Sequence, residues 1–201
     1  MSGVVALDLS KWSTGFAVWQ PGWTRAHYGS WQLGSEYTSD GAVFAKIHQN
    51  LSELRQVMPF DRIYHEEAIN AANLGGMTNI RALRLASGLA AHVESFGYAM
   101  GCQVTAINIA KWRKDFVGPD MVKDTRAKHR ALAKAKGGKS STTAELKSLT
   151  IERCKQLGMS PANTDQADAI GILDYALDFH EHVTPPWRAN EVLRPMLGAE
   201  Q

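Results

Sequence analysis

Residues 4–7 form a continuous apolar run that ends in an acid, Asp8. A strand without polar alternation is typical of the centre of a sheet that is covered on both faces. Residues 14–19 are a second β-rich run, close enough to form a hairpin with the first, and a third strand is expected over residues 27–33, after the Pro21-Gly22 turn signal. The chain is therefore expected to begin with three antiparallel strands.

The pattern after this region changes to an alternation of helix and strand. Apolar residues recur at three- and four-residue spacing over residues 43–58, which predicts an amphipathic helix that Pro59 ends. A strand is expected over 62–66, a helix over about 78–100 and a strand over 103–107. Since a helix separates them, these two strands should be parallel. The sequence thus predicts an α/β fold: a mixed five-stranded sheet of three antiparallel strands and then two parallel ones, flanked by helices.

Basic residues are concentrated in one stretch. Of the 22 Lys and Arg residues, 11 lie between Lys111 and Lys147, beside only four acids, although the net charge of the whole chain is +2. Such asymmetry indicates a polyanionic partner, and a solvated helix face is the alternative interpretation.

The basic stretch also carries turn signals, Gly118-Pro119 and Gly137-Gly138. We interpret residues 111–138 as an appended basic arm, ordered or mobile, inserted in a single domain over residues 1–182. Residues 183–201 are expected to form an irregular tail.

Several features of the sequence indicate the cellular compartment in which the protein works. No run of about 18 apolar residues exists to span a membrane, and the first ten residues do not resemble a secretory signal. The only cysteines, Cys102 and Cys154, are too few for a disulfide framework, which favours a reducing compartment. We therefore expect a cytoplasmic protein of a bacterial cell or of a virus-infected bacterial host.

Acids stand at the ends of otherwise apolar elements: Asp8 ends the first strand, Glu66 and Glu67 end the fourth, and Asp165 and Asp168 open an apolar helix expected over residues 164–179. A buried, unpaired carboxylate is costly and needs a cation or a proton. Oxygen ligands favour hard cations such as Mg²⁺ or Mn²⁺, and two such ions together promote phosphodiester hydrolysis. Each acid alone also fits a turn or a helix start, so the hypothesis depends on their convergence.

Three motifs resemble those of the RuvC-like Holliday junction resolvases. Ala6-Leu7-Asp8, followed by Thr14-Gly15-Phe16, resembles the first motif of that family. Glu66 resembles its second acid, and Asp165-Gln166-Ala167-Asp168-Ala169 resembles its closing helix motif. The order and the separation of the three motifs match as well.

The resemblance implies an RNase H-like fold, a homodimer, two Mg²⁺ ions for which Mn²⁺ can substitute, and nicking of four-way DNA junctions. It implies that the metal ligands are Asp8, Glu66, Asp165 and Asp168. It also implies that Lys147, in a helix expected over residues 141–157, contacts the scissile region. Leu9 and Ser10 stand where the family usually has Pro-Gly, and Ile69 stands where it has an aromatic residue.

Basic residues are the candidates for DNA contacts: Arg81, Lys111, Arg113, Lys114, Lys123, Arg126, Lys128 and Arg130. Trp112 could stack on DNA, but packing against the core is the more common role of such a residue.

Three other functions stay open at this point. The first is a nuclease for flaps, forks or RNA–DNA hybrids, and the second is a module that binds branched DNA without cutting it. The third is an actin-like ATPase or sugar kinase, which needs glycine-rich phosphate loops, whereas Leu-Ser-Lys-Trp follows Asp8. We therefore expect neither a nucleotide cofactor nor a membrane partner.

Overall fold

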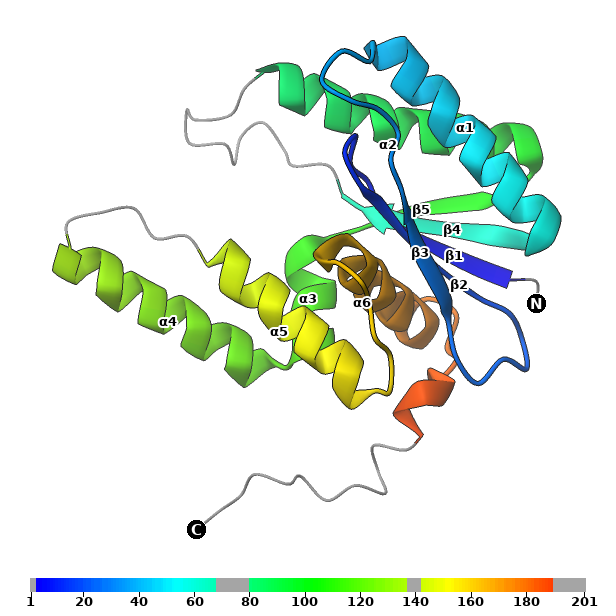
Figure 1. Cartoon of the computed structure of the whole chain (residues 1–201). Coiled ribbons are helices and arrows are strands. Elements are labelled where there is room, and N and C mark those ends of the chain that lie inside the picture. Colours follow the sequence, from blue (N-terminus) through cyan, green and yellow to red (C-terminus); the bar gives the residue numbers. More distant parts are fainter. Residues whose placement is uncertain (1–2, 68–79, 137–141, 190–201) are drawn as a thin grey trace.

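The computed structural model of the 201-residue chain describes residues 3–67, 80–136 and 142–189. These residues form a central sheet with helices on both faces (Figure 1). The helices are α1 (Asp40–Val57), α2 (Ile80–Met100), α3 (Ile109–Val117), α4 (Pro119–Lys136), α5 (Thr143–Gln156) and α6 (Thr164–Phe179). None of the helices in the described ranges is long and apolar enough to cross a membrane.

The sheet has five strands in the order β3-β2-β1-β4-β5. Their bounds are β1 (Gly3–Asp8), β2 (Thr14–Trp19), β3 (His27–Trp31), β4 (Phe60–Glu66) and β5 (Gln103–Ile107). β2 pairs antiparallel with β1 and with β3, whereas β4 pairs parallel with β1 and with β5. The mixed five-stranded α/β fold predicted from the sequence is therefore confirmed.

An apolar cluster lies on each face of the sheet. Side chains on both faces of β1 are therefore buried, which explains why its apolar run has no polar alternation. Val4 and Ala6 belong to the cluster beneath α6, whereas Val5 and Leu7 belong to the cluster beneath α1 and α2. Alternation along a strand then places Asp8 on the same face as Val4 and Ala6. The first acid of the site is thus directed toward α6.

The basic segment differs from the expected appended arm, because its described residues form α3 and α4. Trp112 and Phe116 of α3 are fully buried in the cluster beneath α6, which confirms the packed role of Trp112. Gly118, with φ of 106°, ends α3, and Pro119 begins α4, so the turn signal marks a junction between helices. Gly137 and Gly138 lie outside the described residues.

Residues 183–189, the described part of the expected irregular tail, are packed against the helices, and residues 190–201 lie outside the described residues. Residues Pro186–Arg188 form a short 3-10 turn whose Trp187 is buried. The Trp187 indole donates to Asp174 Oδ1 at 2.7 Å, and Arg188 pairs with Asp174 and with Asp115. Asp174 is a fully buried carboxylate of α6, so these donors hold the segment up to residue 189 against the helices.

Candidate acidic active site

The predicted ligands come from elements that meet at one edge of the sheet. β1 and β4 are parallel neighbours with Leu7 opposite His65, so Asp8 and Glu66 follow side by side, one residue further along each strand. Tyr64 belongs to the cluster beneath α6, and alternation places Glu66 on that face too. Both strand-end carboxylates therefore face the start of α6.

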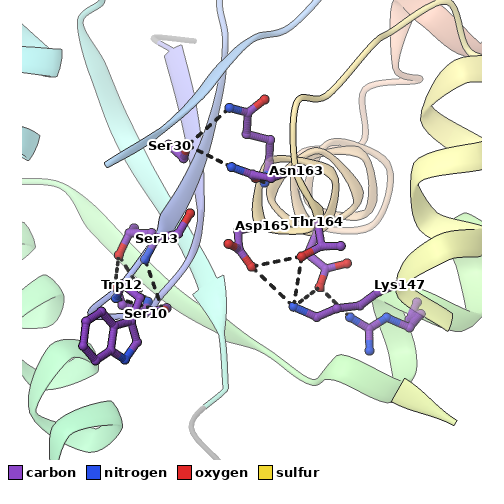
Figure 2. Close-up of polar contacts among 12 residues, drawn as sticks. Ser10, Trp12, Ser13, Ser30, Lys147, Asn163, Thr164 and Asp165 are labelled. Atoms are coloured by element: carbon purple, nitrogen blue, oxygen red, sulfur yellow. Dashed lines mark hydrogen bonds and ion pairs between the residues drawn. The ribbon is translucent and has the colours of Figure 1, made fainter. Parts of the chain in front are cut away.

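Gly15 allows the start of α6 to approach these strands. Gly15 is the partner of Asp8 in the β1–β2 ladder, and a Cβ at Gly15 would lie 1.9 Å from the backbone oxygen of Asp165. The helix start is also tied to β3, because the Asn163 side chain donates to Ser30 Oγ at 3.2 Å (Figure 2). The Thr-Gly motif thus has a structural reason: only glycine allows this close approach.

Lys147 of α5 lies among the acids of α6. Its Nζ is 3.3 Å from Asp165 Oδ1 and 3.8 Å from Asp168 Oδ2, and Figure 2 shows its ammonium directed toward Asp165 and Thr164. The Lys147 side chain is partly exposed, whereas Asp168 is almost fully buried. The structure thus brings Lys147 to the acids, and its contact with the scissile region stays a prediction.

Arg113 of α3 is the second cation at the site. Its Nη2 donates to Asp168 Oδ2 at 2.8 Å, and the two side chains are 8% and 2% exposed. The guanidinium is buried in this ion pair, so the structure places Arg113 beside the acids, and its contact with DNA stays a prediction. Its neighbour Trp112 donates from Nε1 to Glu66 Oε2 at 3.3 Å, so α3 holds two of the acids. The sequence could not show that this face of α3 points inward.

Burial and the charges of neighbouring acids both disfavour ionisation of the carboxyls at this site. Burial, and after it the charges of Asp168 and Glu66, raise the pKa of Asp8 well above its usual range. Burial also raises the pKa of Glu66 and of Asp168, although Arg113 opposes it in both cases. Burial lowers the pKa of Lys147, but Asp168, Asp8 and Asp165 outweigh that effect and raise it. Lys147 is therefore charged at neutral pH, and carboxylates outnumber cations in this cluster of described residues.

The donor atoms suit a hard divalent cation, although the side chains are not arranged around one. All four acids offer oxygen, and the buried Oδ1 of Asp168 has no hydrogen-bond partner, so it is free to be a ligand. Within the described ranges, however, no three acids, histidines or cysteines are close enough together to form a metal site. Lys147 and Arg113 instead neutralise part of the acidic charge. The chemistry of the site fits a cation that competes with Lys147.

The structure also distinguishes the two neighbouring glutamates. Glu67 is exposed, and its Oε2 accepts a hydrogen bond from Asn108 Nδ2 at 3.0 Å. Glu66 contacts Trp112 and is coupled to Asp168 and Lys147. Glu66 is therefore the member of the pair that belongs to the acidic cluster.

The other basic candidates lie on the surface, away from the buried ion pair: Lys111 and Lys114 on α3, Lys123, Arg126, Lys128 and Arg130 on α4, and Arg81 on α2 are all exposed. Lys128 Nζ is 3.1 Å from Glu145 Oε1, so its charge is partly neutralised. Lys123, Arg126, Arg130 and Lys134 recur at three- and four-residue spacing and share a face of α4. We call these four residues the basic stripe. Ile69, by contrast, lies outside the described residues.

No protein-family model and no curated protein sequence matches the chain. Solved structures do match it in three dimensions, and two of them are structures of RuvC. RuvC of Thermus thermophilus, solved in complex with a Holliday junction substrate, aligns over 89% of this chain and 97% of its own, with a TM-score of 0.58 and 14% identity. The chain has a RuvC-like fold. A second structure of Thermus thermophilus RuvC aligns over 87% of this chain and 95% of its own, with a TM-score of 0.56 and 16% identity.

Proposed function

We propose that this protein is a divalent-metal-dependent endonuclease that hydrolyses phosphodiester bonds in branched DNA. The observation that carries the proposal is the convergence of Asp8, Glu66, Asp165 and Asp168 at one edge of the sheet, with more carboxylates than cations among them. The solved RuvC complex supports the substrate class, because that protein holds a Holliday junction on the same fold. The basic stripe of α4 supports a polyanionic partner.

The four acids would hold Mg²⁺ or Mn²⁺, and two ions are expected if the site follows the RuvC pattern. Divalent cations in such a site activate a water molecule and stabilise the leaving oxygen of the phosphodiester. Four carboxylates in one place would repel a phosphate, so the site needs positive charge before DNA can enter.

The residues of the chain have separate tasks in this proposal. Arg113 fixes Asp168 through Oδ2 and leaves Oδ1 for a ligand. The Trp112 indole holds one oxygen of Glu66 in the same way. Lys147 carries its proton at neutral pH and is partly exposed, so its ammonium is able to donate to an oxygen of the scissile phosphate.

The test compares a four-way junction, a 5′ flap and a linear duplex of the same total length, each with and without Mg²⁺. We expect nicks close to the branch point of the junction, only when Mg²⁺ or Mn²⁺ is present. Cleavage of the flap alone would support nuclease activity but with a flap, rather than a four-way junction, as the substrate. Absence of cleavage of every substrate in both metals would contradict the proposal.

A module that binds branched DNA without cutting it is the second candidate. The observation that favours it is that Lys147 and Arg113 pair with Asp165 and Asp168 and so neutralise part of the acidic charge. Binding of the junction in the same assay, without nicks in either metal, would support it. Light scattering of the complex would show in both cases whether the protein acts as the expected homodimer.

A further inference from the structure

The loop between β1 and β2 presents a large aromatic side chain to solvent. Trp12 is 58% exposed, and it lies four residues after Asp8. Exposure of an indole to water is unfavourable, since a tryptophan buries a large apolar area when it packs. Trp12 packs into neither of the two apolar clusters of the described residues.

The loop that carries Trp12 is fixed by its own hydrogen bonds. Thr14 is fully buried, and its hydroxyl donates to the Ser10 carbonyl at 2.6 Å and accepts from the Ser10 backbone N–H at 3.1 Å. The Ser10 hydroxyl accepts from the backbone N–H groups of Trp12, at 3.3 Å, and Ser13, at 3.5 Å (Figure 2). The backbone that carries the indole is therefore held by hydrogen bonds, beside the strand that ends in Asp8.

Lys11 ties this loop to the segment between β3 and α1. Its carbonyl accepts from the backbone N–H groups of Leu33 and Gly34, both at 3.1 Å, and its ammonium donates to the Thr38 carbonyl at 2.7 Å. The same ammonium is 5.8 Å from the centre of the Trp12 ring. Trp12 is thus an exposed aromatic ring on a hydrogen-bonded loop, with a positive charge beside it.

We propose that Trp12 stacks on an unpaired nucleobase of the DNA that enters the acidic site. The proposal rests on the proposed function, and it assigns to this chain a contact that would select DNA with unpaired bases. Every base has a face that stacks on an aromatic ring, and a pre-positioned ring loses little entropy on binding. The Lys11 ammonium adds attraction for the phosphates that flank such a base.

The experiment measures the affinity for fluorescently labelled DNA by anisotropy in EDTA, so that nothing is cut. One probe is a fork with two single-stranded arms, and the other is a linear duplex of equal charge. Trp12→Ala should weaken binding of the fork by about tenfold, the usual loss for one stacked base. Trp12→Phe should retain most of the affinity, and neither variant should change binding of the duplex appreciably.

Trp23→Ala is the matched control, because Trp23 is also exposed, at 37%, but lies in the turn at the other end of β2. It should bind both probes as the unaltered protein does. The stacking proposal would be overturned if Trp12→Ala bound the fork as tightly as the unaltered protein does. It would also be overturned if the variant lost the same affinity for the fork and for the duplex. A change in molar mass of Trp12→Ala would overturn it too, since Trp12 would then contact a second copy of the chain.

The stacking proposal can fail while the nuclease proposal holds, and the nuclease proposal can fail while the stacking proposal holds. If the protein nicks the junction but Trp12→Ala binds the fork normally, the nuclease proposal holds and the stacking proposal is wrong. If Trp12→Ala binds the fork weakly but the unaltered protein never cuts DNA, the stacking proposal holds and the nuclease proposal is wrong.

Discussion

At the scale of single residues, Asp8 is the group on which the charges of the site act most strongly. Burial and the neighbouring carboxylates raise its pKa, so the folded state binds a proton at Asp8 more tightly than the unfolded state does. Its contribution to stability is complete below the unfolded pKa, about 3.9. It is lost as the pH rises through the raised folded pKa. At neutral pH the buried Asp8 therefore destabilises the fold, because the unfolded state ionises this carboxyl more readily than the folded state does.

Asp8→Asn should consequently stabilise the metal-free protein at pH 7, because the amide keeps the shape of the side chain and does not ionise. We expect the melting temperature in EDTA to rise by a few degrees, which is about 1 kcal/mol for a chain of this size. The gain should shrink toward pH 4, where Asp8 is protonated in the original protein. Circular dichroism melts at the two pH values measure both effects. A lower melting temperature of Asp8→Asn at pH 7 would show that Asp8 is not repelled by its neighbours.

At the scale of elements, the site depends on how closely α6 approaches the strand hairpin. The backbone of Asp165 lies against Gly15, opposite Asp8, so the distance between β2 and α6 sets the distance between the acids. α6 also contacts β1, β3 and β4. A wider β2–α6 separation would therefore move Asp165 and Asp168 away from the strand-end acids.

Gly15→Ala should damage the site for this reason. Its Cβ would meet backbone, which cannot move aside as a side chain can, so we expect a loss of about 1–3 kcal/mol in the free energy of unfolding. Well below its melting temperature, where the variant is still folded, its nicking rate in Mg²⁺ should nevertheless be lower than that of the unaltered protein. Gly41→Ala is the control, because nothing lies within 4 Å of its added Cβ in the first turn of α1. Equal nicking rates in the two variants would contradict this role of Gly15.

The elements were predictable wherever the apolar pattern was strong. β2, β5 and α6 have the bounds that the sequence predicts, since each is a compact apolar run between turn signals. The basic residues of α3 and α4 obscured their helical pattern, so the buried face with Trp112 and Arg113 was not foreseen as part of the site. Convergence of the acids was only a hypothesis, because it depends on sheet order and on contacts far apart in the sequence. Pairing of the tail with Asp174 was missed for the same reason.

At the scale of the whole molecule, positive charge is concentrated on one projecting helix. α4 lies beside α5 at one side of the molecule (Figure 1). The four residues of the basic stripe are all exposed. The stripe runs over 12 residues, from Lys123 to Lys134, and its 11 steps of 1.5 Å give a length of about 17 Å. That length matches a few successive phosphates, so the helix is suited to follow a duplex arm of the substrate.

Lys123→Ala should therefore weaken junction binding at low salt and flatten its salt dependence. Loss of one phosphate contact changes the slope of log K against log salt by about 0.9. Lys128→Ala removes the same charge from the same helix, but Lys128 pairs with Glu145, so its effect should be smaller. Anisotropy titrations across a range of salt concentrations give both slopes. Identical slopes for Lys123→Ala and the unaltered protein would mean that the basic stripe keeps the protein soluble and does not bind DNA.

The central claim, that the converging acids hold the metal that cuts DNA, is tested most directly by the nicking rate of Asp8→Asn. The rate is measured in a single turnover, in Mg²⁺, with enough protein to bind all of a labelled four-way junction. We predict that Asp8→Asn binds the junction at least as tightly as the unaltered protein and produces no nicks, because it lacks a metal ligand rather than a DNA contact. Nicking by Asp8→Asn at the rate of the unaltered protein would contradict the account.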